Sequence, residues 1–161
     1  MKNELTLTRS IPAPRDEVFI YWTEPKLLEK WAFPKGMRLT VAHFEAKAGG
    51  KYRFEHAQGE DVYLCNGHFE EFVPNEKLVQ VDKVDSPEKG LLFENLKSTI
   101  LLKDEAGGTR VEVTQNGFPD QKSANECKVS WEESLNNLHD LITHRRFRPG
   151  QDLRMHHVRG E

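Results

Sequence analysis

The feature of the sequence that most constrains the fold is an amphipathic stretch near its C-terminal end, from Ser123 to His144. At about 100° per residue, its apolar and small residues fall within an arc of roughly 120°. These residues are Cys127, Trp131, Ser134, Leu135, Leu138, Leu141 and Ile142. The stretch contains no Gly or Pro, and Ser123 with Glu126 matches a capping box at its start. It predicts a helix over 123–144 whose apolar stripe must be covered.

Almost all of the chain before this helix has the alternation typical of β-strands. A half-buried strand is expected from Leu5 to Ile11, followed by two short helices over roughly 14–22 and from about Pro25, the second capped by Thr23. Six further strands are expected, with a β-bulge at Glu70-Glu71 and a loop over 85–90. The six segments are about 37–46, 51–56, 61–72, 78–81, 91–103 and 110–114. Short turns between these strands indicate an antiparallel meander, so the pattern predicts an α+β fold in which a sheet curls around the terminal helix.

Length and charge indicate one domain with a distinct tail. The chain has 161 residues, and we expect a single domain over 1–144 and a basic tail over 145–161. The net charge is −3, from 23 basic and 26 acidic residues, and this balance argues against nucleic acid as the main partner. Five arginines in the tail against two acidic residues leave the first 144 residues at −6. The tail is either a solvated end or a contact for an acidic partner, for a nucleic acid, or for the acidic body of a second copy in a homodimer.

No apolar run approaches the roughly 20 residues that a membrane span needs, so we expect no membrane span. The N-terminus lacks the apolar segment of a signal peptide. The two cysteines, Cys65 and Cys127, lie within apolar patterns without the spacing of metal ligands, which indicates reduced buried thiols. The expected location is therefore the cytoplasm.

Four groups of residues carry a family resemblance over about residues 3–144. They are Ile11-Pro12-Ala13-Pro14 with Val18-Phe19, Trp22-Thr23, Pro25, Leu28 and Trp31; Gly49-Gly50 with Tyr52-Arg53-Phe54; Gly67 and Phe69 with Pro74 and Glu76-Lys77-Leu78-Val79; and Gly108-Thr109 and Val111 with Gly117-Phe118, Trp131, Leu135 and Leu138. In their order and spacing they resemble the SRPBCC superfamily, which has the START and birch-pollen-allergen helix-grip fold. Within it they resemble the branch related to the C-terminal domain of the activator of the heat-shock chaperone ATPase.

This resemblance implies a curved sheet of about seven strands gripping the long C-terminal helix, with two short helices after the first strand and an apolar cavity between sheet and helix. Members of the superfamily bind hydrophobic molecules, act as cyclases or hydrolases, or assist the chaperone, so the fold alone does not fix the function. No catalytic motif is shared by this branch, and no catalytic residue is carried over to this chain.

A set of mostly aromatic residues is expected to face the space between helix and sheet and to bind an apolar or amphipathic small molecule. Each of these side chains could equally belong to a closed core. His56 shares the parity of Tyr52 and Phe54 and is the polar candidate for orienting a ligand, although a lone histidine is often only hydrogen-bonded in place. The expected ligand-binding residues are Trp31, Phe44, Phe54, His56, Tyr63, Phe69, Val81, Trp131 and Leu135.

The sequence predicts neither a metal site nor a cofactor. His139 and His144 are five residues apart, which does not place them on one helix face, and Cys65 has no base placed beside it by the sequence. Three functions stay open: a module binding a hydrophobic small molecule, a chaperone-type or other protein-interaction domain, and an enzyme with a polar pair facing the cavity. The first is the hypothesis we favour, and an enzyme is the one we favour least.

Overall fold

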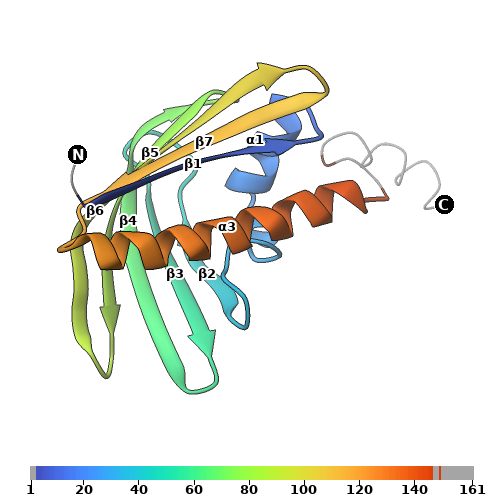
Figure 1. Cartoon of the computed structure of the whole chain (residues 1–161). Helices are drawn as coiled ribbons and strands as arrows, with labels where there is room; N and C mark the ends of the chain where they lie inside the picture. The colour runs from blue at the N-terminus through green and yellow to red at the C-terminus, as the bar shows by residue number, and fades with distance from the viewer. Residues whose placement is uncertain (1–2, 147–148, 150–161) are drawn as a thin grey trace.

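The computed structural model describes residues 3–146 and 149. One antiparallel sheet of seven strands, in the order β1-β7-β6-β5-β4-β3-β2, curves around the long helix α3 (Figure 1). The elements in chain order are β1 (Glu4–Ile11), α1 (Arg15–Thr23), α2 (Pro25–Leu28), β2 (Arg38–Phe44), β3 (Lys51–Gln58), β4 (Asp61–Val73), β5 (Lys77–Ser86), β6 (Gly90–Glu105), β7 (Gly108–Asn116) and α3 (Gln121–Thr143). The predicted α+β helix-grip architecture and the order of its elements are confirmed.

Strands β2 to β7 form the expected meander, and β1 returns to pair with β7. The β1–β7 register runs from Glu4 opposite Asn116 to Ile11 opposite Thr109. The β4–β5 register shifts between Phe69 and Glu71, which confirms the predicted bulge. Two more shifts follow in the β5–β6 pair, and such irregularities increase the local twist of a sheet. Strands β5 and β6 are also longer than expected, so the connection between them is 87–89 rather than 85–90.

Helix α3 has the predicted buried stripe, but it begins earlier than the sequence suggested. Its N-cap is Asp120, whose side chain accepts a hydrogen bond from the Ser123 amide at 2.7 Å, so the expected cap at Ser123 is wrong. The carboxylate stabilises the positive end of the helix and satisfies one of its free N–H groups. Leu135, Leu138 and Ile142 are almost fully buried along the stripe.

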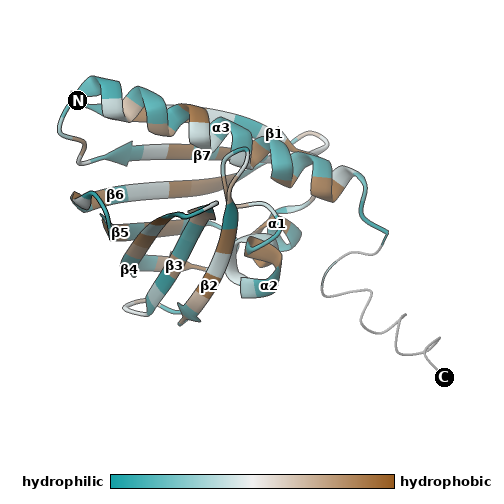
Figure 2. Ribbon diagram, turned by 90° about the horizontal axis from the view of Figure 1, so that it is seen from below, coloured by the Kyte–Doolittle hydropathy of each residue, from teal (hydrophilic) through white to brown (hydrophobic). Residues whose placement is uncertain are grey.

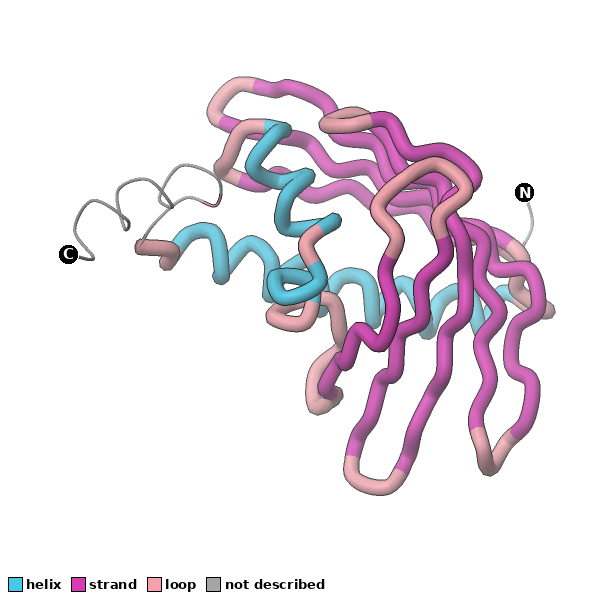
Figure 3. Tube along the Cα trace, turned by 180° about the vertical axis from the view of Figure 1, so that it is seen from behind, coloured by secondary structure: helices cyan, strands magenta, loops and turns pink. Residues whose placement is uncertain are grey.

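The two short helices lie at one end of the concave face of the sheet (Figure 3). The expected cap at Thr23 is also wrong: the N-cap of α2 is Glu24, and the Thr23 hydroxyl donates instead to the Phe19 carbonyl at 2.8 Å. Trp31 follows α2, is 1% exposed, and donates its indole N–H to the Tyr21 carbonyl at 3.0 Å. The indole bond fixes the orientation of Trp31 against α1.

A buried ion pair connects α1 to the end of α3. Glu17 is 4% exposed, and Arg145 reaches it with an Nε–Oε2 distance of 2.6 Å. Arg145 and Arg146 begin the basic tail expected over 145–161, and apart from Pro149 the rest of that tail lies outside the described residues. Among the helices of the described residues, none is long and apolar enough to cross a membrane.

Candidate functional site

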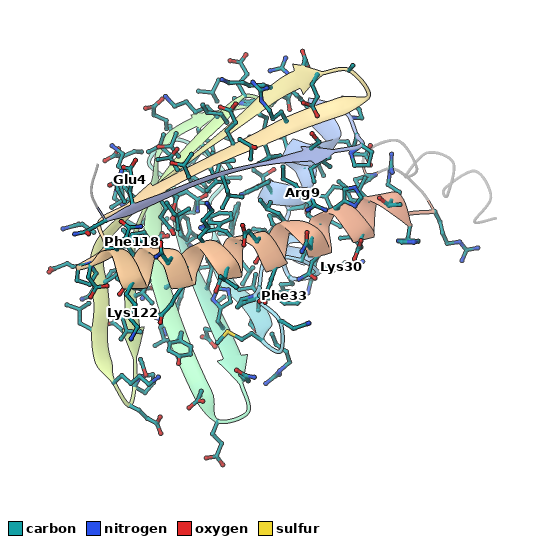
Figure 4. The ribbon with its side chains drawn as sticks, viewed as in Figure 1. Glu4, Arg9, Lys30, Phe33, Phe118 and Lys122 are labelled. Atoms are coloured by element: carbon teal, nitrogen blue, oxygen red, sulfur yellow. The ribbon has the colours of Figure 1, made fainter. Side chains whose placement is uncertain are left out.

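A cavity of about 440 Å³ lies between the concave face of the sheet and helix α3. Helix α3 packs closest to β1, while β2, β3 and β4 diverge from it on the far side of the sheet (Figure 2). Side chains from one helix cannot fill the space that opens in this way. Phe118 precedes α3, and Phe33 lies beside its middle, where the Phe33 carbonyl accepts from the Asn137 side chain (Figure 4).

Seven of the nine residues predicted to bind a ligand line this cavity. They are Trp31, Phe44, Phe54, His56, Tyr63, Phe69 and Trp131. Leu135 is instead 1% exposed in the core, and Val81 is half-buried; neither contributes to the cavity lining. The role of the seven lining residues in ligand binding stays a prediction. Val81 and Leu135 are not placed to contact a ligand in this cavity.

The position of Val81 follows from the side of the sheet that β5 presents to the cavity. Gln80, Asp82 and Val84 line the cavity, so the odd-numbered neighbour Val81 points to the opposite face. Sequence reasoning placed Val81 inward because it is apolar, and it missed Gln80 and Asp82 because they are polar. The sequence carried no clear signal here, because Leu78 and Val84 on one parity and Val79 and Val81 on the other are all apolar.

Tyr52, Gly67 and Asp82 form a row across three neighbouring strands. Gly67 of β4 lies opposite Tyr52 of β3 and opposite Asp82 of β5. The Tyr52 hydroxyl donates to Asp82 Oδ1. A Cβ on residue 67 would lie 2.6 Å from two ring atoms of Tyr52 and closer still to Asp82 Oδ1. The missing side chain of Gly67 is therefore what allows the phenol and the carboxylate to meet.

Burial dominates the electrostatics of this row. It raises the pKa of Asp82 from 3.8 to about 6, although hydrogen bonds from Tyr52 and Cys65 favour the charged carboxylate. Burial, and then the charge of Asp82, raise the pKa of the Cys65 thiol well above its usual value. Cys65 is therefore a neutral thiol and a poor nucleophile, and its role is to donate to the carboxylate.

His56 lines the cavity, but its Nε2 is already hydrogen-bonded within the protein. Its Nε2 lies 3.2 Å from the carbonyl oxygen of Ala32, to which it can donate. Burial lowers the pKa of His56, and the bond to the Ala32 carbonyl only partly opposes this effect. At neutral pH the imidazole is therefore uncharged, held in place by the segment after α2.

A second set of polar side chains lines the cavity beneath α3. Trp131 donates its indole N–H to Gln115 Oε1 at 3.1 Å, and Gln115 donates to the Ser98 hydroxyl at 2.8 Å. Gln115 and Ser98 are 6% and 3% exposed, and all three residues line the cavity. Sequence reasoning missed Gln115, near the end of β7, and Ser98, near the middle of β6, because both residues are polar and were not expected to face inward.

The side chains of the cavity lining that carry a formal charge are acidic. Asp82 and Glu126 line the cavity, and among the described residues the lining includes no Lys or Arg. The ammonium of Lys89 donates to the Tyr63 hydroxyl at 3.0 Å, but this contact is solvent-exposed. Among the described residues, no group of three or more His, Cys, Asp or Glu side chains is arranged to hold a metal ion.

Solved structures share this architecture over most of their length. A crystal structure of a protein from Chromobacterium violaceum has a TM-score of 0.78 and 27% identity, covering 87% of this chain and 97% of that one. A protein from Mycobacterium smegmatis has a TM-score of 0.75 and 15% identity, covering 91% and 94%. A protein titled AHSA1 from Silicibacter pomeroyi has a TM-score of 0.76 and 14% identity, covering 87% and 97%. A search of curated proteins found no match.

The family comparison agrees with the fold and with the resemblance to the SRPBCC superfamily, which is confirmed. The model of the family described as Activator of Hsp90 ATPase homolog 1-like protein matches residues 12–143, a range that includes every element from α1 to α3. This chain belongs to the Activator of Hsp90 ATPase homolog 1-like family.

Proposed function

We propose that the protein binds a hydrophobic or amphipathic small molecule in the cavity between the sheet and α3. The observation that supports this function is the cavity of about 440 Å³, a volume within the range of small-molecule sites. Its lining is mainly aromatic and aliphatic, with polar groups gathered at Asp82 and at Gln115. An apolar body with one polar end matches this distribution, because apolar surface drives binding and the polar groups fix orientation.

A fluorescence titration with the neutral apolar probe N-phenylnaphthylamine tests this proposal. The variant Ser130→Trp adds a large side chain at a half-buried position of α3 that lines the cavity. The matched control Asn136→Trp places the same side chain on the exposed face of the helix. We expect wild type and Asn136→Trp to bind the probe and Ser130→Trp to lose binding while keeping its circular dichroism spectrum. Equal binding by all three proteins, or no binding by the folded wild type, would refute a cavity site.

The family match favours a second function, in which the domain acts on a chaperone of the Hsp90 class. The description of the family names activation of the chaperone ATPase, and the family model covers residues 12–143. An ATPase assay of such a chaperone, with and without this protein, tests the function directly. Stimulation that survives Ser130→Trp would assign it to the surface, whereas stimulation lost in that variant but kept in Asn136→Trp would connect it to the cavity. Unchanged ATPase activity in the presence of wild type would exclude this function for the chaperone tested.

A further inference from the structure

We infer that the cavity selects an apolar ligand that carries a protonated amine, and that the amine pairs with Asp82. This inference rests on the proposed function and adds the chemistry of the ligand's polar end. Its basis is the placement of a carboxylate on the inner face of the sheet, within a lining that offers no basic side chain among the described residues.

Asp82 has acceptor capacity to spare. Tyr52, in the same row on β3, donates to Oδ1, and the Cys65 thiol is a second donor. Two carboxylate oxygens offer about four acceptor positions, so these two donors leave room for a ligand group. Because Asp82 lines the cavity, we expect its remaining acceptor positions to face a bound ligand.

The other groups around the cavity do not supply the missing positive charge. His56 is half-buried and hydrogen-bonded to a carbonyl, Glu126 adds a second acidic group, and Cys127 is a neutral thiol at pH 7. Charge complementarity therefore favours a cation in this space and disfavours a carboxylate such as that of a fatty acid.

The inference is tested with three probes of one chain length: decylamine, decanol and decanoate. Their affinities are measured by isothermal titration below their aggregation concentrations. At about pH 8 we expect decylamine to bind roughly tenfold more tightly than decanol, since a hydrogen bond to a charged group exceeds a neutral one by about this factor. Decanoate is expected to bind more weakly than decanol.

A pH series and two variants assign the effect to Asp82. The advantage of decylamine should fall as the pH drops from about 8 to about 5, because Asp82 becomes protonated while the amine stays charged. Asp82→Asn should abolish the advantage and its pH dependence while decanol binding stays within about twofold. Asp85→Asn, on the same strand but outside the cavity lining, should behave as wild type. If Asp82→Asn does not fold, the pH series on wild type decides.

The outcomes separate the two proposals. Decanol and decylamine binding with equal affinity at every pH would overturn the inference and leave the proposed function standing. Decanoate binding more tightly than decanol would also overturn it, and loss of that preference in Lys89→Gln would locate the anion site at Tyr63 and Lys89. Binding of none of the three probes by the folded protein would count against both proposals.

Discussion

Gly67→Ala is expected to destabilise the protein, although alanine normally suits a strand better than glycine. The added Cβ would lie 2.6 Å from Cε1 and Cζ of Tyr52 and against Asp82 Oδ1. The Tyr52 ring cannot easily withdraw, because it stacks on Phe54 at 4.7 Å and packs edge-on to Phe69 at 5.0 Å between ring centroids. The strand must shift or the hydrogen bond between Tyr52 and Asp82 must break.

The expected cost is the sum of three effects. Overpacking a core costs about 1–3 kcal/mol, and weakening a hydrogen bond to a carboxylate costs about 1.5–3 kcal/mol. Alanine also lowers the conformational entropy of the unfolded chain, which offsets about 0.4–1 kcal/mol of this cost. Breaking the hydrogen bond would relieve part of the clash, so the first two costs do not add in full. We therefore expect the free energy of unfolding to fall by about 2–4 kcal/mol. In a domain of this size that corresponds to a fall in Tm of roughly 5–15 °C.

Urea and thermal denaturation measure this loss, with Asn66→Ala as the control. Asn66 is the exposed neighbour of Gly67 on the same strand, and its substitution should change stability by no more than about 0.5 kcal/mol. In an Asp82→Ala background the Gly67→Ala cost should shrink, because one of the two crowded partners has been removed. A Gly67→Ala variant within about 0.5 kcal/mol of wild type would show that the close packing of the row is not what requires glycine.

Three further predictions concern charges and thiols. Arg145→Ala should lower the free energy of unfolding by about 3–5 kcal/mol in urea denaturation, because it removes the cation beside the buried Glu17. Adding Glu17→Gln to that variant should recover part of the loss. A loss below about 1 kcal/mol in Arg145→Ala would contradict this prediction. The pKa of Asp82 is raised on folding, so the folded state binds the extra proton and the contribution of this residue to stability should fall as the pH rises from about 4 to about 6, by about 2–3 kcal/mol. That fall should be absent from Asp82→Asn, and identical pH profiles would refute it. Iodoacetamide should modify Cys127 before Cys65, because Cys65 is more deeply buried. Decanol should slow the reaction at Cys127, which lines the cavity. Mass spectrometry of the labelled peptides measures both effects.

The fold could be predicted from the sequence because two simple periodicities are obeyed with few exceptions. The stripe of α3 is buried as expected, and Val129, the apolar residue on its outer face, is 52% exposed. The bulge after Phe69 was visible as a one-residue slip in alternation. Helix starts were less certain, since Asp120 and Ser123 are both good caps and local sequence does not say which carboxylate or hydroxyl reaches a free N–H.

The polar part of the candidate site could not be predicted, and β5 shows why. Leu78 and Val79 are adjacent and both 2% exposed, so alternation could not say which parity faces the cavity. Placing Asp82 inward would have required a buried carboxylate with a partner, and that partner comes from β3 through the gap at Gly67. Only the register of three strands, which depends on bulges and turns, brings these residues together.

The pairing of β1 with β7 has a consequence for how the chain is made. A ribosome releases Leu5, Leu7 and Ile11 about one hundred residues before their partners in 109–116 exist, and helix α3, which packs on the same strand, follows later still. Until β7 and α3 have been made, these apolar side chains have no native neighbours on the sheet. Folding of this domain should therefore be comparatively slow, as is usual when strands far apart in the sequence must pair.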